Sequence, residues 1–207
     1  MPKASDLRVL LVRSGQTQWD AAGRVTGSAD LPLTDAGRRH IQEEVAALDG
    51  ARLGVVLCGP DEGSRETAGI VAEATGARVK TVEGLHEMRL GLWEGLRAAD
   101  LEERYPKAYR QWTDDPAAVL VPDGETVSEA MDRLVSELAR SLERVKEASQ
   151  GVGVVLRPMA LALVRCWMGD GKTKGVWTCG DQPDVEWRSL GRDQIRRPRE
   201  PARVATQ

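Results

Sequence analysis

Residues 8–17 read RVLLVRSGQT, and this stretch indicates the fold class of the chain. The apolar run at residues 9–12 is too short to cross a membrane and is typical of a strand buried on both faces. Arg13, Ser14 and Gly15 follow it. Because ligands in open α/β sheets bind just beyond the carboxyl ends of the strands, Arg13 is a cation where an anion is expected, and Gly15 permits close approach of the backbone. Spacing alone favours a plainer interpretation, an arginine that reaches solvent at a strand end.

Composition narrows the class of protein. The chain has 207 residues and a formal net charge of −3, which suits one domain and gives no reason to expect nucleic acid as a partner. No basic-then-apolar leader and no long apolar run are present, so neither secretion nor a membrane span is expected. Cys58, Cys166 and Cys179 are odd in number and form no CxxC pair. They indicate reduced thiols in a cytoplasmic protein, with no metal site, and we expect no cofactor.

Apolar runs and helical patterns alternate along the chain. Further strands are expected at residues 53–57, 79–82, 151–156 and 185–190. Helices are expected at residues 34–48, 60–74, 98–113 and 126–148, the third of them broken at Pro106. Thr126 and Glu129 have the spacing of a capping box, whereas residues 19–33 and 172–184 lack a sustained period and indicate loops. The alternation predicts an α/β three-layer sandwich with a mostly parallel sheet flanked by helices.

The C-terminal end differs in character from the rest. Residues 1–191 are expected to form one domain, and residues 192–207 are basic, broken by prolines and poor in apolar side chains. Such a composition predicts a flexible tail, with an arm that binds a protein partner as the alternative.

Several stretches carry a resemblance to a known family. LVRSGQTQWD at residues 11–20 resembles the signature L-V-R-H-G-E/Q-T-x-W-N of the histidine phosphatase (phosphoglycerate mutase-like) superfamily. Later stretches also resemble that family's text: GRVTGSADLPLTDAG at residues 23–37, DEGSRETAGIVAEA at residues 61–74, LHEMRLGLWEGL at residues 85–96 and PDGETVSEAMDRL at residues 122–134. VVLRPMALALVRCWMG at residues 154–169 stands where the family has V-S-H-G-G-x-I-R. The resemblance spans residues 7–169.

The resemblance implies a site in which catalytic positions have changed. The family's nucleophilic histidine corresponds to Ser14, its second phosphate-binding arginine to Gly63, and its general acid to Glu87, which is kept. Its second catalytic histidine corresponds to Leu156 or Arg157. We favour Arg157, because Pro158 then falls in the first turn of the next helix, where proline is tolerated.

The remaining candidates concern binding and substitute chemistry. Arg13, Gln16 and Arg157 are the expected binding residues. Arg65 lies two residues beyond Gly63, about 200° around a helix, and therefore cannot simply replace the missing arginine. His86 is a candidate substitute base beside Glu87, but adjacent side chains usually point apart.

Three functions follow from this interpretation. The first is a pseudoenzyme with a histidine-phosphatase fold, which binds a small phosphorylated or carboxylate ligand, or a protein, without turnover. The second is an active phosphatase or phosphotransferase with a rebuilt site that uses Ser14, or Glu87 with His86. The third is a structural subunit of a larger assembly, contacted through the C-terminal region.

Overall fold

A single mixed sheet organises the chain. The computed structural model describes residues 6–48, 50–145, 151–169, 173 and 176–196. Within them, five strands form a sheet in the order β3-β2-β4-β1-β5. Their bounds are β1 Leu7–Arg13, β2 Leu53–Cys58, β3 Arg78–Thr81, β4 Gly151–Leu156 and β5 Val185–Leu190. Only β5, at one edge, is antiparallel to its neighbour, so the predicted mostly parallel sheet is confirmed.

The pairing of β1 with β4 forms the centre of the sheet. Val9 pairs with Val152 and Arg13 pairs with Leu156, so the two strands end side by side. Residues 9–12 are all fully buried, as their continuous apolar run predicts. Each such side chain contributes about 1.5–3 kcal/mol to the hydrophobic stabilisation of the folded state.

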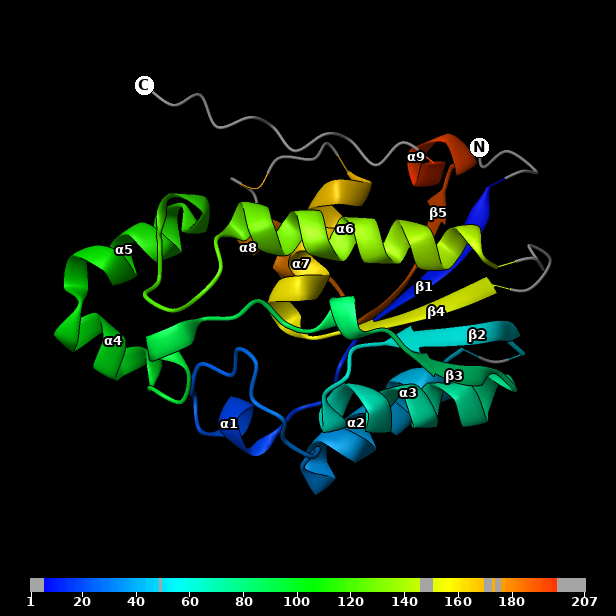
Figure 1. Ribbon diagram of the computed structural model, residues 1–207. Coiled ribbons are helices and arrows are strands. Elements are labelled where there is room, and N and C mark those ends of the chain that lie inside the picture. The colour runs from blue at the N-terminus through cyan, green and yellow to red at the C-terminus, as the bar shows by residue number, and fades with distance from the viewer. Residues whose placement is uncertain (1–5, 49, 146–150, 170–172, 174–175, 197–207) are drawn as a thin grey trace.

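Helices cover both faces of the sheet. Figure 1 shows α2 (Asp35–Ala46) and α3 (Glu62–Thr75) on one side, and α6 (Val127–Glu143) and α7 (Pro158–Met168) on the other. The core divides in the same way, because Leu10 packs with the α2 and α3 side whereas Leu11 packs with the α6 and α7 side. This is the predicted three-layer α/β sandwich.

Local signals explain where several helices begin. Thr34 caps α2 by accepting a hydrogen bond from the Gly37 amide, and Thr126 and Glu129 form the expected capping box at the start of α6. Pro106 separates α4 (Ala98–Arg104) from α5 (Pro106–Asp114) and is the first residue of the second helix. In Figure 1 these two helices lie beyond one end of the sheet.

Two expected loops contain short helices. Residues Gln18–Ala21 form α1, a single turn that is too short to show a period in the sequence. Residues Val176–Gly180 form α8, which packs against α7 and buries Val176 within a stretch whose Gly, Lys and Asp content hid the helix. Short 3-10 turns also occur elsewhere in the described residues, among them η1 Glu83–Leu85, η2 Gly91–Trp93 and η3 Pro116–Ala118.

Two predicted boundaries fall elsewhere. Helix α6 ends at Glu143 rather than near residue 148, and residues 146–150 lie outside the described residues. Residues Arg192–Arg196, placed in the expected tail, form α9 and bury Ile195 in the core. The remainder of that tail, residues 197–207, also lies outside the described residues.

The capping box of α6 yields a test of local stability. Thr126→Ala removes a side chain that bonds the Glu129 amide, and we expect it to lower the free energy of unfolding by about 1 kcal/mol. Ser136→Ala is the matched control, because Ser136 is exposed on the same helix away from the cap. Urea unfolding curves of both variants check this, and an equal loss in both would contradict a capping role.

Candidate active site

The candidate site lies where β1 and β4 end. The backbone N–H of Ser14 donates a hydrogen bond of 2.8 Å to the Leu156 carbonyl oxygen. The residue that follows each strand, Ser14 after β1 and Arg157 after β4, is therefore placed at the same edge of the sheet. Leu156 is fully buried within its strand, so it is Arg157 that reaches Ser14.

A short network joins Ser14, Arg157 and Asp20. Arg157 donates from Nη1 to Ser14 Oγ at 3.2 Å, and from Nη2 to the Asp20 carboxylate at 3.3 and 3.4 Å. The Arg157 side chain is only 3% exposed and Ser14 is 5% exposed. The serine hydroxyl thus accepts a hydrogen bond from a guanidinium, which cannot take up a proton.

Asp20 was missed as a site residue. Its Oδ2 accepts hydrogen bonds from the Thr17 N–H at 2.7 Å and from Thr17 Oγ1 at 2.6 Å, which completes the capping box of α1. The cap fixes the orientation of the carboxylate towards Arg157. Two signals were available in the sequence: the three-residue spacing from Thr17, and an aspartate where the family signature ends in asparagine.

Glu87 lies buried at the N-terminus of α7. Its Oε1 accepts from the Met88 amide at 2.7 Å and the Ala160 amide at 2.8 Å, and its Oε2 accepts from the Met159 amide at 2.8 Å. The carboxyl group therefore satisfies amides that α7 leaves without partners in its first turn. Burial raises the pKa of Glu87 above its ordinary value, and the Met88 amide, the Arg157 charge and the other two amides lower it by less.

Arg133 holds the segment around Glu87. Its guanidinium donates to the carbonyl oxygens of Gly84 and His86, each at 2.9 Å, and it forms an ion pair with the buried Glu125. His86 is oriented by a 2.7 Å hydrogen bond between its Nδ1 and the Glu87 carbonyl oxygen. It lines a small cavity of about 150 Å³ that also touches Glu87.

Arg13 is the exposed cation of the site. Its side chain is 44% exposed, and its closest carboxylate contact is Asp184 Oδ1 at 3.5 Å. The other oxygen of Asp184 lies 2.9 Å from His40 Nε2. Two other arginines line the same cavity as Arg13, and both have closer contacts within the protein. Arg165 bonds Glu186 at 2.7 Å, and Arg24 bonds the Gly95 carbonyl oxygen.

Gln16, Gly15 and Gly63 belong neither to the Ser14–Arg157–Asp20 network nor to the lining of the cavity beside it. Gln16 is exposed, and its Oε1 accepts from Thr34 Oγ1 at 3.2 Å. The Gly15 backbone approaches α2 rather than a ligand space, since a Cβ there would lie 3.2 Å from the Ile41 side chain. At Gly63, a Cβ would lie 3.1 Å from the Leu31 carbonyl oxygen, so the position is crowded.

The site borders a cavity of about 470 Å³ that is lined by Asp20 but not by the buried Ser14 and Arg157. Arg13 and Glu87 are further charged residues of its lining. Trp112 and Trp177 belong to its apolar lining and meet edge to face, with ring centroids 5.6 Å apart. These tryptophans come from α5 and α8, so the broken helical segment predicted at residues 98–113 does contribute a wall of the site.

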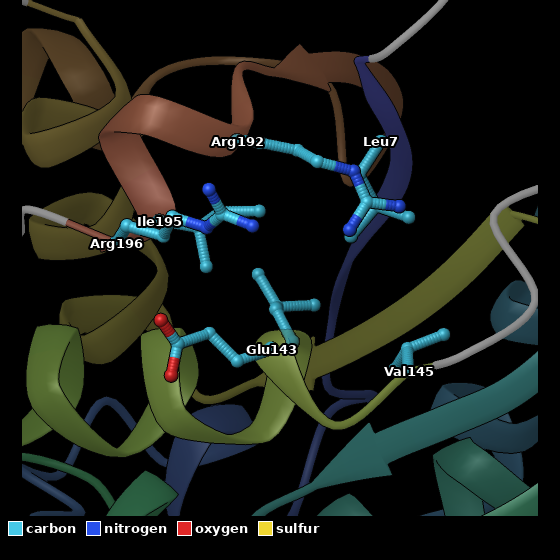
Figure 2. Close-up of a pocket in the computed structure, with 7 residues that line it drawn as sticks. Leu7, Glu143, Val145, Arg192, Ile195 and Arg196 are labelled. Atoms are coloured by element: carbon cyan, nitrogen blue, oxygen red, sulfur yellow. The ribbon is translucent and has the colours of Figure 1, made fainter.

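A separate cavity of about 300 Å³ lies at the other end of β1. Figure 2 shows Leu7 of β1, Glu143 of α6, and Arg192 and Arg196 of α9 around it. It shares no lining residue with the cavity at Arg13. The chemistry of the candidate site is therefore confined to the carboxyl end of the sheet.

The described residues were also considered as possible metal ligands and membrane-spanning helices. No group of three or more His, Cys, Asp or Glu side chains there is arranged to hold a metal ion. No helix in that part of the chain is long and apolar enough to cross a membrane. The Sγ atoms of Cys166 and Cys179, 13 residues apart in sequence, lie 2.9 Å from each other.

The model of the histidine phosphatase superfamily (branch 1) matches residues 9–196. The chain belongs to this superfamily. It is 25% identical over 174 residues to "Phosphoserine phosphatase 1" of Hydrogenobacter thermophilus, covering 84% of this chain and 82% of that protein. It is 31% identical over 159 residues to "Probable phosphoglycerate mutase GpmB" of Escherichia coli O1:K1 / APEC, covering 76% and 71%.

A solved structure supports the same conclusion about the fold. Bacillus stearothermophilus YhfR superposes with a TM-score of 0.78 at 22% identity, covering 87% of this chain and 90% of that chain. The phosphoglycerate mutase-like fold inferred from the motifs is therefore confirmed. Within this superfamily member, the two positions compared with the catalytic histidines are Ser14 and Arg157, and their side chains touch.

The environment of Glu87 generates a prediction about pH. Its pKa is raised from the ordinary value of 4.5, so the folded state holds the proton at a pH where the unfolded chain has lost it. This stabilisation is present below the ordinary pKa and is lost as the pH rises through the raised one. As the pH rises above the ordinary pKa of 4.5, the free energy of unfolding should therefore fall more in the wild type than in Glu87→Gln. Denaturant unfolding across this range measures both slopes, and parallel curves would contradict the prediction.

Proposed function

We propose that this member of the histidine phosphatase superfamily binds an organic anion in the cavity at Arg13 and does not turn it over through a phosphohistidine. The observation that carries the proposal is the contact between Ser14 Oγ and Arg157. A serine hydroxyl needs an adjacent base to become a useful nucleophile, and the hydrogen-bond partner it has here is a permanent cation.

The lining of the cavity supports the class of ligand. Arg13 offers an exposed guanidinium suited to a phosphate or carboxylate group. Trp112 and Trp177 offer apolar surface for the body of the ligand. The favoured ligand is therefore a small phosphorylated or carboxylate compound with an aromatic or aliphatic body.

The second candidate function is an active phosphatase or phosphotransferase with a rebuilt site. The names of the relatives favour it, since one is called a phosphatase and the other a mutase. The raised pKa of Glu87 also suits a general acid. The Nδ1 of His86 donates to the Glu87 carbonyl oxygen, which leaves Nε2 as the basic nitrogen, but His86 lines the small neighbouring cavity and not the one at Arg13. The third candidate, a structural subunit contacted through the C-terminal region, stays a prediction, and residues 197–207 of that region lie outside those described.

A turnover measurement separates the first two functions. We expect wild-type protein to release phosphate from a broad panel of phosphomonoesters no faster than Ser14→Ala or Arg13→Ala does. Loss of a nucleophile typically lowers the rate on the order of a millionfold, so a working Ser14 would separate these proteins clearly. Turnover that is abolished by Ser14→Ala, with a phosphoryl adduct on the wild-type protein, would instead establish the rebuilt enzyme.

A binding measurement tests the role of Arg13. We expect Arg13→Ala to weaken the binding of phenyl phosphate by about tenfold or more, because a hydrogen bond to a charged group contributes about 1.5–3 kcal/mol. Arg65→Ala is the control for the change in net charge, since Arg65 is exposed on α3 and does not line the cavity. Titration calorimetry measures both variants. Equal affinities for Arg13→Ala and wild type would contradict the proposed site.

A further inference from the structure

The ion pair between Asp20 and Arg157 is linked to Ser14 through the Arg157 guanidinium. Arg157 reaches Ser14 with one guanidinium nitrogen and Asp20 with the other. Asp20 lines the cavity, whereas Arg157 is 3% exposed and is not part of the lining. An anion that enters from the cavity towards Ser14 therefore encounters the Asp20 carboxylate, and it competes with that carboxylate for Arg157.

Charge compensation explains why the carboxylate stays there. A buried guanidinium remains charged and is costly unless an anion is paired with it. Among the described residues, Asp20 is the carboxylate within hydrogen-bond distance of Arg157. Glu87 contributes to the field at Arg157, but burial favours its neutral form. Asp20 is thus the main compensating charge.

The capping box keeps Asp20 from turning away. Both the amide and the hydroxyl of Thr17 donate to its Oδ2, at 2.7 and 2.6 Å. Both carboxylate oxygens also lie within hydrogen-bond distance of Arg157 Nη2, Oδ2 at 3.3 Å and Oδ1 at 3.4 Å. The carboxylate is therefore anchored to Thr17 through Oδ2 while both of its oxygens face the guanidinium.

We infer that Asp20 is a specificity-determining residue: an internal carboxylate that neutralises Arg157 and so keeps small, multiply charged anions such as inorganic phosphate from binding to that guanidinium. Ligand anions are then directed to Arg13, the half-exposed arginine of the cavity lining. The inference deepens the proposed function, because it rests on this cavity being the ligand site.

The experiment compares the binding of inorganic phosphate by charge variants of the full chain. Asp20→Asn removes the competing charge with little change in shape, and we expect it to bind phosphate about tenfold or more tighter than the wild type does. Asp20→Ser is a second neutral variant with the same expectation, which keeps the test decisive if the first does not fold. Asp20→Glu retains the charge and should still exclude phosphate.

A matched control separates a specific effect from a general one. Asp181→Asn removes a negative charge from the lining of the same cavity, but Asp181 forms no hydrogen bond or ion pair with Arg157. It should raise the affinity for phosphate far less than Asp20→Asn does. An equal gain in both variants, or no gain in either neutral Asp20 variant, would overturn the inference.

A double variant distinguishes this inference from the proposed function. If phosphate enters beside Arg157, the gain from Asp20→Asn should persist in the Arg13→Ala background. If the gain disappears there, the new phosphate is bound at Arg13, and the role given to the Asp20–Arg157 pair is wrong. If the wild-type protein does not bind phenyl phosphate through Arg13, the proposed function is wrong. The comparison of phosphate binding between wild type and the Asp20 variants can still be interpreted in that case.

Discussion

The parallel pairing of β1 with β4 is the constraint on which the site depends. Because Arg13 pairs with Leu156, the residues that follow the two strands are brought to one edge of the sheet although they are far apart in sequence. The full burial of residues 9–12 and the helices on both faces hold this register. A slip of one residue would turn the apolar side chains of β1 to the opposite faces and separate Ser14 from Arg157. The chemistry of the site is therefore set by the same packing that stabilises the sheet.

Most of the buried and partly buried arginines near this edge of the sheet form ion pairs with carboxylates of the protein. Arg157 is paired with Asp20, Arg165 with Glu186, and Arg133 with Glu125. Buried pairs of this kind contribute little net stability compared with apolar side chains of similar size, but removing one partner is costly because it leaves the other charge uncompensated. Arg13, which is half-exposed and only weakly paired, is left as the cation that an incoming anion can contact. Among the three arginines that line the cavity, Arg13 therefore has the guanidinium with the weakest contacts within the protein.

The sequence predicted the parts of the structure that depend on neighbouring residues. The buried run at residues 9–12, the cap at Thr126 and the helix break at Pro106 each act within a few residues, and each was found where expected. The motif spacing also brought out Glu87 and favoured Arg157 over Leu156. The Asp20–Arg157 ion pair could not be predicted from neighbouring residues. The two residues are separated by most of the sequence, and the register of the sheet brings them together. Gln16 illustrates the opposite case. It matches the family motif, but its side chain bonds Thr34, the cap of the adjoining helix, instead of lining the cavity.

The family relationship and the site residues answer different questions. A fold is maintained by many apolar positions, so a chain can keep the histidine phosphatase architecture while the few residues that touch a phosphoryl group change. Arg157 is a buried guanidinium, and a buried charge is costly unless it is neutralised. Asp20 meets that requirement, being held by Thr17 and paired with Arg157. Ser14, Arg157 and Asp20 are best understood together, because the arginine that bonds the serine hydroxyl is the same one that requires the carboxylate.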